Sequence, residues 1–222
     1  MKSSGIILMF LSFCFFMQAE GLSQLVYSGI EREYITPIYS EQQNPEWCWA
    51  ANVQLVLNYY GARVSQEDII KRSFGVHNPY DNLPKWDKEF KNITSRLNGW
   101  VIHYNKDRYF FHIKLVYGSP SPELLLKELK NSSPVIFADS INADSVRPIV
   151  ITAVGFLPGY YGPVIKELMV RDVMPNNPDN SKNQINKWKI SDVSKNISAY
   201  WLINVSKEKI AIRKNLKKKK VE

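Results

Sequence analysis

The chain has 222 residues, of which 45% are hydrophobic and 13% aromatic, and its formal net charge is +8. This composition is typical of a globular protein, and the length suffices for one domain or two small lobes with a buried core. Part of the positive charge lies in residues 209–222, which we expect to form a solvated basic tail that could add nonspecific attraction to an anionic surface. Because no zinc finger, RNA-binding aromatic motif or basic helix accompanies the tail, the sequence indicates no nucleic-acid partner.

The first residues predict a secretory signal peptide. A basic start is followed by an apolar run over residues 5–17 and then by Ala19, so we expect cleavage near Ala19 and a signal peptide over residues 1–19. An N-terminal membrane anchor is the alternative. The run is shorter than the ~20 residues of a bilayer-spanning helix, and no later segment is long and apolar enough to cross a bilayer. We therefore expect a secreted or periplasmic protein without a stable membrane anchor.

The first predicted helix contains a cysteine near its start. Residues 21–41 are expected to form an extended lead-in to it. Asn44 suits the N-cap, and Pro45 suits the first helical position. Apolar residues then recur at helical spacing up to Gly61, a typical C-terminal stop. Cys48 thus falls in or near the first turn, where the helix N-terminus favours the thiolate over the thiol.

Further helices and then strands follow in chain order. Capping signals and apolar spacing predict helices over residues 65–73, 86–97 and 122–129, and a hairpin over residues 100–117. Short β-rich runs follow at residues 134–138, 149–156, 164–173, 188–190 and 199–205. Helices followed by an antiparallel set of strands predict an α+β fold with a helical lobe (about 35–133) and a β lobe (about 134–206), within one domain over residues 20–208.

The cysteine count singles out Cys48. Cys14 lies in the predicted signal peptide, so the mature chain would hold one cysteine, which cannot form a disulfide within the chain. Such a thiol is either buried and inert or reactive. Gln42 and Gln43 lie just upstream, where a side-chain amide could fold back beside the thiol and donate N–H groups to an oxyanion.

These residues resemble a known family. Gln42-Gln43, the segment Trp47-Cys48-Trp49-Ala50-Ala51 and the helix up to Gly61 look like the active-site helix of papain-like cysteine peptidases, in particular the bacterial branch that includes secreted effector proteases. Weaker likenesses follow in the family's order at residues 134–136, 150–155 and 170–175. The resemblance implies a two-lobed papain-like fold with a cleft between the lobes. It also implies a peptide or protein as substrate or ligand in the cleft, no cofactor and a monomer.

The resemblance also implies roles for single residues. Cys48 would be the nucleophile, Gln42 the oxyanion donor with Gln43 as second choice, and Asp172 the residue that orients the base. The family's histidine is missing: Arg147 aligns best with its position, and a shifted register places Pro148 or Ile149 there, neither of which is a histidine. Arginine stays protonated and cannot accept and return a proton near neutral pH. It could instead stabilise a Cys48 thiolate, or form an ion pair with Asp172 that replaces the His–Asp pair.

The sequence is compatible with three alternative functions. The first is a papain-like protein that is attenuated or inactive as a peptidase, a pseudoenzyme that retains peptide binding. The second is an active cysteine peptidase that recruits His103 or His112 as its base. The third is a non-catalytic secreted binding protein on the same scaffold. Asp139 and Asp144 could line the cleft near Arg147, although solvated loop positions are the simpler expectation. The three histidines of the chain, His77, His103 and His112, lack metal-ligand spacing, so no metal site is predicted.

Overall fold

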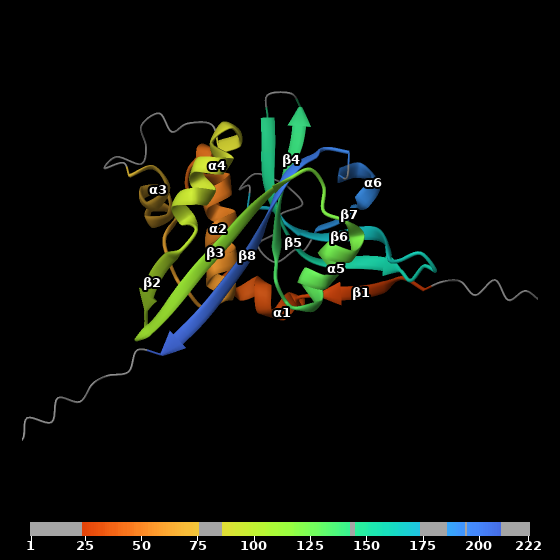
Figure 1. Ribbon diagram of the computed structural model, residues 1–222, viewed down its shortest axis with the longest axis horizontal. Coiled ribbons are helices and arrows are strands. Elements are labelled where there is room, and N and C mark those ends of the chain that lie inside the picture. Colours follow the sequence, from red (N-terminus) through yellow and green to blue (C-terminus); the bar gives the residue numbers. More distant parts are fainter. Residues whose placement is uncertain (1–23, 76–85, 143–144, 174–185, 194, 210–222) are drawn as a thin grey trace, which may run out of the picture.

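The computed structural model describes residues 24–75, 86–142, 145–173, 186–193 and 195–209, and within them the chain forms one eight-stranded antiparallel sheet with helices packed on it (Figure 1). The strand order is β2-β3-β8-β4-β5-β6-β7, and β1 pairs with β5. The strands are β1 (Val26–Gly29), β2 (Trp100–Tyr104), β3 (Asp107–Tyr117), β4 (Val135–Asn142), β5 (Ser145–Leu157), β6 (Val164–Arg171), β7 (Asn186–Lys189) and β8 (Ile197–Lys209). The helices are α1 (Arg32–Ile35), α2 (Cys48–Tyr59), α3 (Gln66–Phe74), α4 (Trp86–Leu97), α5 (Pro122–Lys130) and α6 (Ile190–Val193), with 3-10 turns at Thr36–Ile38 and Pro45–Trp47.

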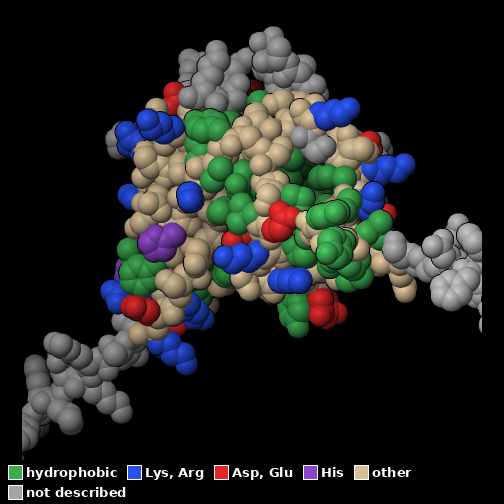
Figure 2. All heavy atoms as spheres, turned by 45° about the vertical axis from the view of Figure 1, so that its right-hand side comes forward, with side chains coloured by type: hydrophobic (Ala, Val, Ile, Leu, Met, Phe, Trp, Pro, Cys, Tyr) green, Lys and Arg blue, Asp and Glu red, His purple; other side chains and the backbone are tan. Residues whose placement is uncertain are grey.

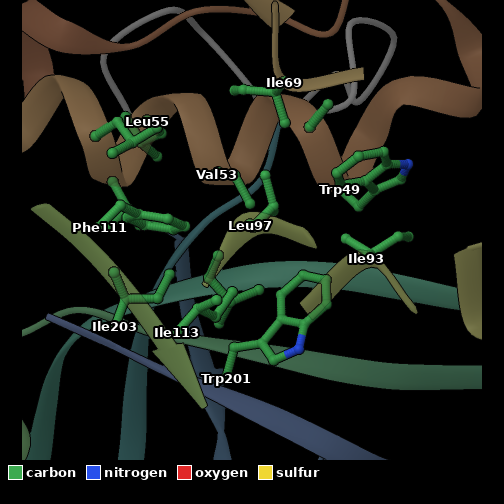
Figure 3. Close-up of a cluster of buried hydrophobic side chains, with 14 of the residues drawn as sticks. Trp49, Val53, Leu55, Ile69, Ile93, Leu97, Phe111, Ile113, Trp201 and Ile203 are labelled. Atoms are coloured by element: carbon green, nitrogen blue, oxygen red, sulfur yellow. The ribbon is translucent and has the colours of Figure 1, made fainter. Parts of the chain in front are cut away.

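The sheet separates two hydrophobic cores. Along β4, Ile136 and Ala138 belong to the core under α2, α3 and α4, whereas Val135 and Phe137 belong to the core that includes α5. This alternation is the period-two geometry of a strand that is buried on both faces. Figure 1 shows α2, α3 and α4 together beside β2 and β3, with α5 and α6 toward β6 and β7. Figure 3 shows how the first core is filled by Trp49 and Val53 of α2, Ile93 and Leu97 of α4, Phe111 and Ile113 of β3, and Trp201 and Ile203 of β8.

The predicted α+β class with an antiparallel sheet is confirmed. The hairpin expected over residues 100–117 forms β2 and β3, and its turn residues Asn105 and Lys106 both have positive φ angles, 48° and 65°. This hairpin joins the other strands through β8, so the helical half and the β half of the chain share one sheet. Helix α5 packs on β1, β4 and β5 rather than on the other helices.

The helix signals are confirmed where caps were predicted. The Asn44 side chain accepts a hydrogen bond from the Glu46 amide at 3.1 Å, but the first turn, Pro45–Trp47, is a 3-10 turn, and α2 begins at Cys48. Ser65 and Asp68 form the predicted capping box of α3. The expected extended lead-in instead contains β1, α1 and a second 3-10 turn.

Several predictions concern residues outside the described part of the chain. They are the signal peptide over residues 1–19, most of the tail over residues 209–222, and the positions of His77 and Asp144. Among the described helices, none combines the length and hydropathy that a membrane crossing requires.

Candidate functional site

Cys48 is the first residue of α2 and is partly buried against the first core. Asn52, which is fully buried one helical turn later, holds the Cys48 backbone in place through its side-chain hydrogen bonds. The Asn52 side-chain amide donates to the Cys48 carbonyl at 2.8 Å and to the Pro148 carbonyl of β5 at 3.1 Å. The start of α2 is therefore tied to the strand position next to Arg147.

A second connection joins the segment before α2 to the end of β6. The Gln42 amide donates to the Val173 carbonyl at 3.1 Å, and the Tyr39 hydroxyl donates to the Asp172 carbonyl at 3.1 Å. Together with the Asn52 bonds, these contacts bring Cys48, Arg147 and Asp172 together from three separate segments of the chain.

Arg147 lies between two buried carboxylates. Its guanidinium contacts Asp139 Oδ2 at 2.9 Å and Asp172 Oδ2 at 3.8 Å. Asp139 is the cross-strand partner of Arg147 in the β4–β5 pairing, and its side chain is 8% exposed. The guanidinium also stacks over the ring of Trp188 at 4.6 Å, a favourable cation–π distance. Arg147 is thus held on three sides, and the Arg147–Asp172 ion pair inferred from the resemblance is present.

The thiol of Cys48 is not activated by its position. Burial, with smaller contributions from the negative charges of Glu46 and Asp172, raises its pKa to about 12. Backbone hydrogen bonds at Trp49 and at Cys48 itself lower the pKa, as expected at the start of a helix, but burial outweighs them. The expected lowering of the Cys48 pKa is therefore wrong, and the thiol is protonated at neutral pH.

The two glutamines differ in their surroundings. Gln42 is partly buried, and its side-chain Nε2 donates to the Pro45 carbonyl at 3.4 Å. Gln43 is exposed, and its backbone amide donates to Gln66 Oε1 at 2.9 Å. Of the two, Gln42 is directed back toward the start of α2, the side on which an oxyanion donor would have to lie. The roles of both residues remain predictions.

His103 and His112 lie away from Cys48. Both side chains are exposed on the β2–β3 hairpin at the edge of the sheet. Their neighbours Ile102, Phe111 and Ile113 point into the core beneath α2, so the histidines point from the opposite face of the strands. A base from either residue would have to act through the sheet, and the geometry gives that alternative no support.

Metal binding has no support within the described residues, which contain no group of three or more histidine, cysteine, aspartate or glutamate side chains suited to an ion. Asp139 was expected at a solvated position, but it lies within β4 and is buried.

Three residues that surround the candidate site were not predicted from the sequence: Asn52, Gln66 and Trp188. Gln66 is fully buried and donates to Glu41 and Gln54, so it fixes the loop that carries the glutamines. A polar residue on the apolar face of a predicted helix was the signal that could have found Asn52.

Comparisons with known proteins give weak likenesses. No protein-family model matches the sequence, and no curated protein matches it either. One similar solved structure is the peptidase domain of Streptococcus ComA, a bi-functional ABC transporter involved in quorum sensing; it is 11% identical, covers 74% of this chain and 95% of its own, and has a TM-score of 0.46. Another is a double glycine motif protease from an AMS/PCAT transporter in complex with the leader peptide, 15% identical, with 82% and 91% coverage and a TM-score of 0.38. Any relation to papain-like peptidases therefore rests on the residues of this chain.

Proposed function

We propose that this chain is a secreted papain-like protein that binds a peptide beside Cys48 and hydrolyses peptides weakly or not at all. The observation that carries the proposal is Arg147, which lies between Asp139 and Asp172 at the position where the resemblance requires a histidine. The chain would then keep the family's nucleophile and third residue without the base between them. Secretion, a bacterial source and a monomeric state are parts of this proposal that rest on the sequence.

The missing base removes two steps from amide hydrolysis. A cysteine peptidase needs a group that takes the thiol proton and later protonates the leaving amine. An arginine side chain does not serve as a general base near neutral pH, and the Arg147 guanidinium is held between two carboxylates. Burial raises the pKa of the thiol to about 12, so few molecules carry a thiolate at pH 7. Loss of one triad member typically lowers kcat by several orders of magnitude.

A peptidase assay tests the proposal. The chain from residue 20 onward would be incubated with casein and with a peptide library, beside the variant Cys48→Ala. We expect the two proteins to give the same background. Hydrolysis by the wild-type chain that is lost in Cys48→Ala would show that a base acts there, and the proposal would be abandoned.

A gain-of-function variant gives the matched comparison. Arg147→His alone would place an imidazole between two carboxylates, which would keep it protonated. Arg147→His combined with Asp139→Asn leaves one carboxylate, Asp172, behind the imidazole. We expect this double variant to show hydrolysis that depends on Cys48, whereas Asp139→Asn alone should not.

A further inference from the structure

A cavity lies at the end of α2 opposite Cys48. It has a volume of about 590 Å³ and is lined by Gly29, Ile30, Glu31, Tyr34, Tyr59, Tyr60 and Ser132. These residues come from the β1–α1 segment, the end of α2 and the turn after α5. Since α2 has 12 residues and a helix rises 1.5 Å per residue, the cavity lies roughly 17 Å from Cys48. It is therefore separate from the candidate site.

Three tyrosine rings form the walls of this cavity. The rings of Tyr59 and Tyr60 lie 5.1 Å apart at 69° to each other, and Tyr34 is 60% exposed at the rim. Ser132 and Ser133 lie beside the Tyr59 and Tyr60 hydroxyls, respectively, where each partly offsets the rise in the tyrosine pKa that burial causes. Ser132 has a left-handed φ of 56°. Two backbone hydrogen bonds of 3.0 Å stabilise that turn: the Ser132 N–H donates to the Leu129 carbonyl, and the Ser133 N–H donates to the Glu128 carbonyl. The turn therefore places two serines beside the rings of Tyr59 and Tyr60.

The charge around the cavity is negative. Glu31 lines it, and the nearby Glu33, through a hydrogen bond and its charge, raises the pKa of the Glu31 carboxyl. The carbonyl end of α2 also points here, and a helix C-terminus favours a cation. Arg32 is a nearby positive charge, and it also lies close enough to Arg171 to add to burial in lowering the pKa of that guanidinium.

We propose that this cavity binds the side-chain ammonium group of a lysine from a peptide or protein partner. Tyrosine faces attract a cation, and each contact contributes about 0.5–2 kcal/mol depending on its exposure. The aliphatic stem of lysine suits the rings, while its N–H groups can donate to Glu31 and to the Ser132 hydroxyl. The carboxylate favours a primary ammonium over a quaternary one, which has no hydrogen to donate. The proposal does not depend on the chemistry of Cys48.

Chemical-shift mapping tests it with small probes. The chain from residue 20 onward would be titrated with the N-acetyl methylamides of lysine, trimethyllysine and norleucine. We expect the lysine probe to shift the amides of Tyr59, Tyr60 and Ser132 with a millimolar Kd, and norleucine, which has the stem without the charge, to bind at least about 10-fold more weakly. Equal binding of norleucine, or no shift at these residues, would overturn the proposal. Tighter binding of trimethyllysine would overturn its preference for a primary ammonium.

Variants at the rim complete the test. Tyr34→Ala and Glu31→Gln change exposed side chains, so both should fold, and each should weaken lysine binding about 5-fold. Tyr117→Ala is the matched control, because Tyr117 is 68% exposed on β3 and lines no part of this cavity. Unchanged binding in both rim variants would refute the site. A failure here would leave the peptidase assay on Cys48 and Arg147 unaffected, so the two proposals are tested separately.

Discussion

Cys48 and Arg147 illustrate how the same residue types can serve or prevent catalysis. A cysteine at a helix start usually gains from the helix dipole, and a nearby arginine usually favours a thiolate. In this protein the thiol is buried near Asp172, and the arginine is engaged by Asp139 and Asp172. The local environment therefore decides against activation, although each residue alone indicates it.

The protonation state of Cys48 gives a direct pH dependence. Because burial raises the pKa of the thiol to about 12, alkylation by iodoacetamide should become roughly tenfold faster per pH unit from pH 7 to 9 without a plateau. At pH 7 the folded chain from residue 20 onward should react roughly 3000-fold more slowly than the same chain unfolded in guanidinium, where the pKa is near ~8.5. The readout is mass spectrometry, with Cys48→Ala as the blank. A plateau by pH 8 would contradict the raised pKa.

Arg147 should also matter for stability. In Arg147→Ala the buried carboxylates of Asp139 and Asp172 lose their counter-charge, and we expect the free energy of unfolding to fall by about 2–4 kcal/mol. Arg108→Ala is the control, because Arg108 pairs with Glu208 at 2.8 Å on the surface and should contribute at most about 1 kcal/mol. Urea denaturation measures both. Equal losses in the two variants would argue against the buried pair.

At the scale of elements, local signals predicted the helices better than the first strand. The cap at Asn44, the box at Ser65 and the turn at Asn105 are all present, because each depends on hydrogen bonds between near neighbours in sequence. Strand β1 has four residues and a weak pattern, and its pairing with β5 joins positions about 125 residues apart, such as Tyr27 and Gly155. No local signal can carry that information.

Gly29 shows what fixes β1 in place. Its φ is +144°, and a Cβ there would lie 2.4 Å from the Cα of Ala153. Gly29→Ala should therefore push β1 away from β5 and lower the free energy of unfolding by more than about 2 kcal/mol. Gly118→Ala, at φ +88° with open space around it, should cost about 1 kcal/mol from backbone strain alone. Thermal and urea unfolding would compare the two, and equal effects would show that the close approach is unimportant.

At the scale of the whole molecule, the sheet joins two cores into one unit. Strands β4, β5 and β8 contribute side chains to both cores, so neither core can unfold without exposing buried side chains of the other.

Figure 2 shows hydrophobic side chains gathered on the half of the surface where α5 and β6 come forward. A groove of about 350 Å³ lies there between Pro122, Leu125 and Val164.

The shared sheet predicts a single unfolding transition. Ile93→Ala in the first core and Leu129→Ala in the second should each lower the free energy of unfolding by about 2–5 kcal/mol, because both side chains are fully buried. Each variant should move tryptophan fluorescence and far-UV circular dichroism together in a urea titration. Val164→Ala, at a position that is 47% exposed, is the control and should change stability little. Two separated transitions in either core variant would show that the lobes unfold independently.

The identities of the main residues of the candidate site could be predicted from the sequence, but their surroundings could not. Cys48, Arg147 and Asp172 were all named from the sequence, and the structure brings them together through the bonds of Asn52 and Gln42. The raised pKa of Cys48 was not foreseen, because burial depends on packing from distant segments. The role of Asp139 was not foreseen either, since it depends on the β4–β5 register that places it opposite Arg147.

The cross-strand pairing of Asp139 with Arg147 has a consequence for the history of this protein. If an ancestor carried histidine at position 147, a single exchange back to it would meet an acid on each side and would not restore the ancestral chemistry. Asp139 would have to change first, and that change alone would leave the arginine less well compensated. We therefore expect the effects of substitutions at positions 139 and 147 on stability and activity to be non-additive. Related chains should accordingly vary at these two positions together rather than singly.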